Sequence, residues 1–250
     1  MFRNTFQSGL ISIFSAGGSH PLQLWDVHLE GDGEIRLIND IGEGDANRDE
    51  SNNHVSGPVI EMTCSNLSQN YIICPTKLDY SSSERPSLGI ALPILYFIMY
   101  VPERTKQQQK QQMNHVSIEV TVLDDKQITR RFRCSTFQST TSIQADFCTF
   151  PLRLTQRPRG LKREQLLLPP SEHDNPQHIH VNEQDDCEAC WNRVCVPLAE
   201  YTQKAYGTKL LETKHIQIQG RRFLLNRVYF AEKQVSEDEL PQEFRLCHDY

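Results

Sequence analysis

The chain has 250 residues and a formal net charge of -6, and this length allows one large domain with an ample hydrophobic core. Its 13 Pro and 12 Gly residues are too few for a collagen-like or wholly low-complexity protein. Its eight Cys residues fall short of the density of a disulfide scaffold, so we expect mostly reduced thiols.

The N-terminal segment contains an apolar run that resembles part of a signal peptide. Ser12 interrupts this run and polar residues precede it, so we expect no signal peptide. The longest apolar run of the chain, 88–101, is shorter than the roughly 20 residues of a membrane-spanning helix. We therefore expect a soluble, intracellular protein without a membrane partner.

Strand patterns dominate the chain. Short strands are expected at 22–29, 34–38, 59–64, 71–74 and 147–154. Between 115 and 123, Val and Ile alternate with polar residues, which is typical of a strand with one buried face. Asp124-Asp125-Lys126 then turn the chain, and 128–134 returns with the same alternation, so the two segments predict a β-hairpin. Its expected inward residues are Val116, Ile118, Val120, Val122, Ile128, Phe132 and Cys134.

The last quarter of the chain contains the clearest helix signal. An amphipathic helix is expected at 198–206, because Pro197 suits a first turn and a glycine follows the last one. The segments 214–219 and 223–230 look like a second antiparallel pair joined near Gly220.

Near the C-terminus, Ser236 and Glu239 form a capping-box pattern, but Pro241 lacks the amide that a continuing helix needs. We expect two short turns there. Many short strands with one or two short helices predict an all-β fold, an antiparallel β-sandwich of the jelly-roll type, as a single domain over 1–250.

Three polar segments do not fit a sandwich. Residues 39–57 are acidic and rich in Asn and Gly, 103–114 form a Gln/Lys spacer, and 155–186 begin basic and end acidic. Such segments bury too little apolar surface to offset the entropy of ordering. We interpret them as flexible insertions at strand connections.

The charge is unevenly distributed. Residues 30–50 contain eight acids and two bases, and 172–188 contain six acids and no base. The remainder is therefore net basic, although the whole chain is acidic.

Several local strings are distinctive: MFRNTFQSG, PLQLWD, VLDDKQITRRFRCSTFQSTTSI, TFPLRL, AYGT and RRFLLNRVYFAEKQVSEDELPQEFRL. In this order they resemble the cilia- and flagella-associated protein 20 family. The three insertions are where the chain departs from the compact members, so it resembles a diverged paralogue.

The resemblance implies a jelly-roll-like sandwich in the wall of ciliary and flagellar doublet microtubules, at the inner junction. Family members act there as structural bridges that contact tubulin and other inner-junction proteins, support cilium assembly and motility, and have no known cofactor. The implied location is the axoneme of the cilium or flagellum, with a cytoplasmic pool and the basal body as further places.

Arginines on outward strand positions are compatible with such a role, because tubulin surfaces are acidic and guanidinium groups bind carboxylates in a bidentate manner. The alternative is an ordinary solvated strand face, since rim charges often add little affinity. The candidate tubulin contacts are Arg131 and Arg133, followed by Arg221, Arg222 and Arg227.

Metal binding is the main rival hypothesis. The candidate zinc ligands lie in one short stretch and are His178, His180, Cys187, Cys190 and Cys195. A structural zinc site usually has two recognisable ligand pairs, and here only Cys187-x-x-Cys190 is one. We therefore prefer a polar loop with incidental thiols and assign no metal.

Other chemistry finds little support. No Gly-x-Ser-x-Gly, P-loop or Rossmann pattern is present, so we expect no enzyme and no cofactor. Nucleic acid is an unlikely partner because 157–163 lacks interleaved aromatic residues. Trp25, Trp191 and Tyr229 could form a sugar platform, although aromatic residues of this kind more often belong to the core. A sugar- or zinc-binding sandwich without an axonemal role remains the alternative function.

Overall fold

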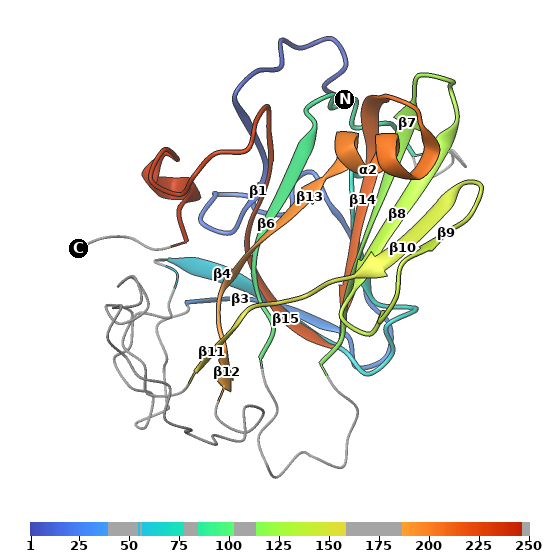
Figure 1. Ribbon diagram of the computed structural model, residues 1–250. Helices are drawn as coiled ribbons and strands as arrows, with labels where there is room; N and C mark the ends of the chain where they lie inside the picture. Colours follow the sequence, from blue (N-terminus) through green and yellow to red (C-terminus); the bar gives the residue numbers. More distant parts are fainter. Residues whose placement is uncertain (40–54, 56, 78–84, 103–113, 159–186, 247–250) are drawn as a thin grey trace, which may run out of the picture.

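Two facing β-sheets make up most of the computed structural model, which describes residues 1–39, 55, 57–77, 85–102, 114–158 and 187–246 (Figure 1). The expected β-sandwich is confirmed. Most strand pairs are antiparallel, but two neighbouring strands of one sheet, 129–135 and 147–151, run parallel. The arrangement is therefore mixed at that edge.

The first sheet has seven strands, and its centre is the predicted hairpin. In spatial order the strands are β2 (Asp26–His28), β5 (Tyr71–Cys74), β14 (Leu210–Gly220), β7 (Val116–Asp124), β8 (Thr129–Ser135), β10 (Phe147–Pro151) and β9 (Ser142–Ile143).

The second sheet has six strands. The order is β13 (Asn192–Pro197), β6 (Ile94–Tyr100), β15 (Arg222–Ala231), β4 (Pro58–Thr63) and β3 (Glu34–Asn39), and β1 (Leu10–Ser15) also pairs with β15. The long β15 pairs with β4 near its start and with β1 near its end.

The β7–β8 hairpin follows its sequence pattern with one exception. The four apolar residues of β7 that were expected inside are fully buried, as are Phe132 and Cys134 of β8. Ile128 is 41% exposed and precedes the strand, whereas Arg130 is buried. The prediction for Ile128 was wrong because Ile128 belongs to the turn that Asp124 closes.

The second predicted pair was also wrong. β14 belongs to the seven-stranded sheet and β15 to the six-stranded sheet, so the two strands meet at a corner and not in a hairpin. Gly220 lies at this corner. A Cβ atom there would come within 2.6 Å of the Phe223 ring and 2.9 Å of the His115 carbonyl oxygen.

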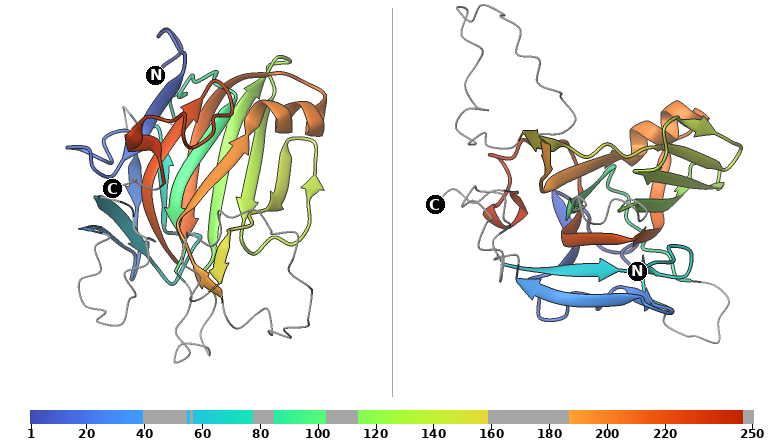
Figure 2. Two further views of the ribbon diagram at one scale, coloured as in Figure 1. Left: turned by 60° about the vertical axis from the view of Figure 1, so that its left-hand side comes forward. Right: turned by 90° about the horizontal axis from the view of Figure 1, so that it is seen from below.

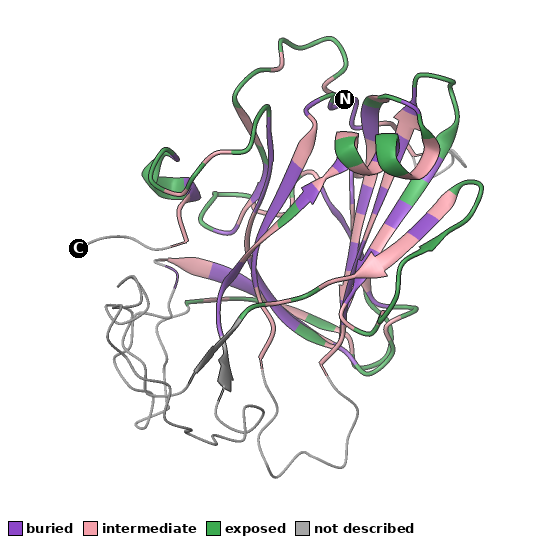
Figure 3. Ribbon diagram, in the orientation of Figure 1, coloured by how far each residue is buried: buried purple, intermediate pink, exposed green. Residues whose placement is uncertain are grey.

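Buried residues occur along the strands of both sheets (Figure 3), and the apolar ones among them form two clusters. The main core lies between the sheets and contains residues such as Phe97, Ile118 and Phe230. A second cluster includes Tyr96 and Tyr229 and lies on the outer face of the six-stranded sheet. There the C-terminal segment 235–246 packs over the sheet, so β6 is buried on both faces.

The helical predictions are confirmed. α2 (Leu198–Tyr206) is followed by Gly207 as its C-cap. The ring centroids of Tyr201 and Tyr206 on this helix lie 6.2 and 5.9 Å from the ring centroid of Phe132 on β8. Near the C-terminus, a short turn precedes the 3-10 helix η2 (Gln242–Phe244). This C-terminal segment and α2 lie on opposite sides of the molecule (Figure 2). Among the described helices, none has the length and apolar character needed to span a membrane.

The three predicted insertions lie largely outside the described residues, so their flexibility stays a prediction. In the first insertion, Asn39 ends β3 and Val55 is buried in the second apolar cluster. The start of the third forms β11 (Gln156–Pro158), which pairs with β12 (Cys187–Ala189).

Candidate partner-binding surface

Arg131 and Arg133 lie on the outer face of the seven-stranded sheet, as predicted. Because side chains alternate along a strand, the burial of Phe132 directs both arginines outward. The parallel pairing of β8 with β10 places Phe147 beside them. The two guanidinium carbons lie 4.9 and 5.0 Å from the centroid of the Phe147 ring, so one ring holds both cations.

The two arginines differ in their acidic partners. Arg133 and Glu119 face each other across the hairpin, and the Nη2 atom of Arg133 lies 2.6 Å from a Glu119 carboxylate oxygen. Arg131 is exposed and forms no ion pair with a described carboxylate. Its charge is thus available to an acidic partner, whereas that of Arg133 is partly satisfied.

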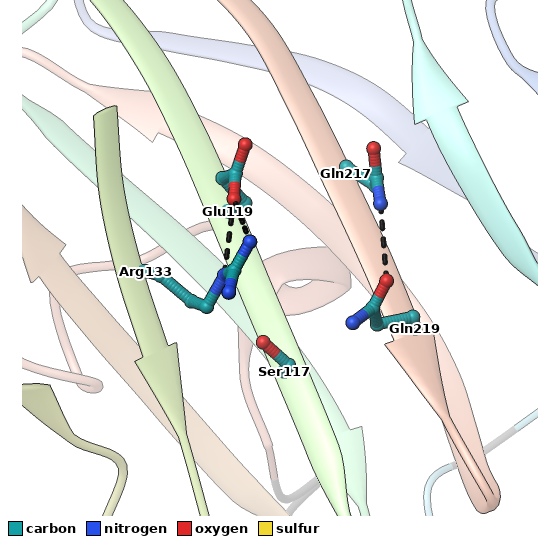
Figure 4. Close-up of a pocket in the computed structure, with 5 residues that line it drawn as sticks. All are labelled: Ser117, Glu119, Arg133, Gln217 and Gln219. Carbon is teal, nitrogen blue, oxygen red and sulfur yellow. Dashed lines mark hydrogen bonds and ion pairs between the residues drawn. The ribbon is translucent and has the colours of Figure 1, made fainter. Parts of the chain in front are cut away.

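A small polar hollow adjoins this pair (Figure 4). Glu119 and Arg133 line it together with Ser117, Gln217 and Gln219. The Gln217 side-chain amide donates a hydrogen bond to the Gln219 side-chain oxygen over 3.1 Å. The hollow has a volume of about 10 Å³, which suffices for at most a water molecule. The hollow is therefore too small for a small-molecule ligand.

The structure does not bring the other three candidate arginines to this face. Arg222 begins β15 and pairs with Glu61 of β4, with 2.7 Å between Nε and Oε1. Arg221, at the corner between the sheets, donates from Nη2 to the Ser65 carbonyl oxygen over 3.0 Å.

Arg227 packs against Phe244 of the second apolar cluster. Its guanidinium carbon lies 4.7 Å from the centroid of the Phe244 ring, and burial lowers the pKa of this guanidinium. Such a covered arginine is a packing residue and not an open contact.

The candidate zinc ligands receive little support. His178 and His180 lie outside the described residues, and for Cys187 only the backbone is placed. Cys190 is buried and its Sγ lies 3.1 Å from the Thr155 carbonyl oxygen, while Cys195 is exposed on β13. Within the described ranges, no group of three His, Cys, Asp or Glu residues could hold a metal ion. The full five-residue set stays untested.

The candidate sugar platform does not exist. Trp25, Trp191 and Tyr229 are 4%, 6% and 0% exposed, which confirms the interpretation that they belong to the core. The indole nitrogen of Trp25 donates to the Ile13 carbonyl oxygen over 3.0 Å. These rings therefore offer no open stacking surface.

Two residues of the surface were missed by sequence reasoning. Glu119 could have been found, because the length of the turn fixes the register of the hairpin and places it opposite Arg133. Phe147 could not, because its position depends on a parallel contact between strands that no hairpin connects.

The CFA20 domain model matches residues 1–161 and 177–248. The chain belongs to the CFA20 domain family. Cilia- and flagella-associated protein 20 of Caenorhabditis elegans is 33% identical over 98% of this chain and 90% of its own length. The proteins of that name from Chlamydomonas reinhardtii and Paramecium tetraurelia are each 32% identical over 98% of this chain and 96% of their own. The resemblance noted in the sequence is thus confirmed.

Among solved structures, the CBM22-1 and GH10 modules of a Clostridium thermocellum xylanase align with 91% of this chain and 29% of their own length. The sequence identity is 6% and the TM-score 0.36, values too low to support an argument about function. Neither the CFA20 domain model nor the three relatives above carry the name of an enzyme.

Proposed function

We propose that this CFA20 domain protein is a non-enzymatic structural component of the axonemal doublet microtubules of cilia or flagella. The observation that carries the proposal is the match of the CFA20 domain over nearly the whole chain, together with relatives named cilia- and flagella-associated protein 20. In this role the protein contacts tubulin and other inner-junction proteins and supports cilium assembly and motility.

The surface chemistry supports a contact with an acidic partner. Arg131 and Arg133 are held side by side on one ring, and the charge of Arg131 has no described counter-ion. Prearranged guanidinium groups lose little conformational entropy when they bind carboxylates. Small-molecule sites are concave pockets of several hundred Å³, and the hollow on this face, at about 10 Å³, is far smaller.

The alternative of a sugar- or zinc-binding module has less support. The three aromatic residues that could have formed a sugar platform are buried, and the two zinc candidates with described side chains, Cys190 and Cys195, differ in burial and surroundings. Stoichiometric zinc that a chelator removes with loss of the fold would favour this alternative.

Localisation of the tagged full-length protein in ciliated cells, followed by detergent extraction of the axonemes, tests the proposal. Retention along the doublets is expected, and binding to purified microtubules should weaken as salt is raised. The tag alone serves as the control. A diffuse or fully extracted signal would mean that the fold has been kept without the axonemal role.

A further inference from the structure

A cleft of about 250 Å³ opens where one edge of the six-stranded sheet faces the seven-stranded sheet. One wall is the strand β13, and the other is the chain at 150–155 that leaves β10. Tyr201 of α2 and Cys134 of β8 complete the lining. The volume suffices for one or two large side chains, so the cleft differs from the hollow beside Arg133 in size and position.

β13, which forms the first wall, is an edge strand of the six-stranded sheet. It pairs with β6 on one side, and no other described strand pairs with it. Five consecutive residues, 192–196, line the cleft, so the edge of the backbone itself faces the opening. In an edge strand every second N–H and C=O group points away from the only partner and is free to pair with another chain.

The opposite wall also leaves backbone groups available. The Leu152 amide donates to the Ser135 carbonyl oxygen over 2.9 Å, which continues the sheet for one more residue. Arg153 and Leu154 form no backbone-to-backbone hydrogen bond with a described residue. At Thr155 the walls are joined, because its amide donates to the Asn192 side-chain oxygen over 2.7 Å. The cleft is thus closed at this end.

The lining of the cleft combines apolar side chains with positive charge. Phe150, Leu152, Val194 and Val196 are apolar, and the charged residues among the lining are Arg153 and Arg193, with no Asp or Glu. Alternating apolar contacts next to a free strand edge are the features that strand-adding recognition sites use.

Neither arginine is neutralised by a described carboxylate. Arg153 is exposed. Arg193 donates to the Val235 carbonyl oxygen over 2.6 Å and lies 4.7 Å from the centroid of the Tyr96 ring, and both of these partners are uncharged. Glu200, on the helix beside the cleft, is already paired with Lys204. Tyr96 belongs to the second apolar cluster, so the Arg193 guanidinium lies on the outer face of the six-stranded sheet and not inside the cleft. Positive charge without a described carboxylate partner therefore flanks β13 on both sides, from Arg153 at the cleft and from Arg193 on the outer face.

We propose that this cleft binds an extended, acidic segment of a partner protein, which adds as a strand to β13. Its backbone hydrogen-bonds along the edge of β13 and an apolar side chain enters the cleft beside Val194 and Val196. Because side chains alternate along a strand, its carboxylates lie on the outer face near Arg193 and at the mouth of the cleft near Arg153. A second copy of this chain is a poorer occupant, because pairing two β13 edges would bring like charges together. The inference does not depend on the ciliary role proposed above.

Binding of a fluorescein-labelled peptide of alternating Glu and Val to the purified full-length protein tests this site. Arg153→Glu should weaken binding about tenfold, and it should strengthen binding of the matched Lys and Val peptide. Arg36→Glu is the control, because Arg36 is also exposed but lies on β3, at the edge of the six-stranded sheet opposite β13. It should leave both affinities unchanged.

Two further measurements test the strand addition itself. N-methylation of alternate peptide amides should abolish binding, since it removes the donors on one edge, and the Glu and Val peptide should slow amide hydrogen exchange within 192–196. The proposal would be overturned if Arg153→Glu bound the Glu and Val peptide as tightly as the wild type does, or if the methylated peptide bound undiminished. It would also be overturned if the peptide slowed amide hydrogen exchange only outside 192–196. A concentration-dependent dimer of the chain with protection of β13 would also overturn it, in favour of a second copy.

Discussion

The Asp124 carboxylate accepts a hydrogen bond from Nε of Arg130 over 3.0 Å, and their side chains are 0% and 10% exposed. The other carboxylate oxygen accepts the backbone amides of Lys126 and Ile128, at 3.0 and 2.8 Å, and closes the turn between β7 and β8. The Arg130 guanidinium carbon lies 4.3 Å from the centroid of the Tyr206 ring on α2. One buried ion pair therefore joins the central hairpin to the helix.

Replacing Asp124 by Asn should destabilise the fold by about 3 kcal/mol, because Arg130 would remain buried without its counter-charge. Urea unfolding followed by circular dichroism measures the loss. Asp125→Asn is the matched control, since Asp125 is the next residue of the turn and is exposed. Equal stabilities of the two variants would contradict the role given to the buried pair.

The same carboxylate predicts a pH dependence of stability. Burial opposes ionisation of Asp124, but hydrogen bonds from the Ile128 amide and from Arg130 outweigh it and hold the pKa of this carboxyl below its usual value. A group whose pKa is lowered on folding stabilises the fold above its unfolded pKa, about 4, and this stabilisation is lost as the pH falls through the folded pKa. The difference in free energy of unfolding between wild type and Asp124→Asn should therefore shrink below about pH 4. A constant difference down to acid unfolding would be the contrary result.

Replacing Arg131 and Arg133 together by Glu should abolish microtubule association and leave the fold intact, because both side chains face outward. Arg131→Glu alone should account for most of the loss, since Arg133 is already paired with Glu119. Cosedimentation with microtubules measures association, and thermal melting checks the fold.

Arg36→Glu is the control for these variants, because Arg36 is an exposed arginine of the other sheet. It should bind microtubules like the wild type. If the double variant also binds unchanged, the face formed by β7, β8 and β10 is not the microtubule contact.

Gly220→Ala should destabilise the protein by about 1–3 kcal/mol, because the added methyl group would collide with the Phe223 ring and the His115 carbonyl oxygen at the corner between the sheets. Gly17→Ala is the matched control, since its methyl group would meet nothing closer than 3.8 Å. Chemical denaturation distinguishes the two variants. An unchanged midpoint for Gly220→Ala would mean that the corner can adapt.

The parts of the fold that could be predicted from the sequence are those set by local pattern. The β7–β8 hairpin combines a period of two with turn residues, and α2 combines a helical period with Pro197 and Gly207, so both segments carry their own start and stop signals. β6 was not predicted as a strand because it is buried on both faces. Its continuous apolar run therefore lacks the alternation that reveals a half-buried strand.

The sequence could not show which of the two sheets a strand belongs to. A glycine such as Gly220 suits a hairpin turn and a corner between sheets equally well, and only packing against Phe223 distinguishes them. For the candidate surface, the outward direction of Arg131 and Arg133 followed from alternation. Their shared contact with Phe147 depends on a parallel strand pair without a local signal.

The second apolar cluster gives the last prediction. The Phe244 ring covers Tyr229, with 4.9 Å between the ring centroids in an edge-to-face arrangement, and Tyr229 stacks on Tyr96 at 5.0 Å. Phe244→Ala should cost about 3 kcal/mol, because it removes a buried ring and uncovers the aromatic pair beneath it. It should also speed amide hydrogen exchange in β15. Glu243→Ala, at the exposed neighbouring position, should change neither quantity. If both variants unfold like the wild type, the C-terminal segment does not contribute to the stability of the six-stranded sheet, and its contacts with Tyr229 and Arg227 are energetically neutral.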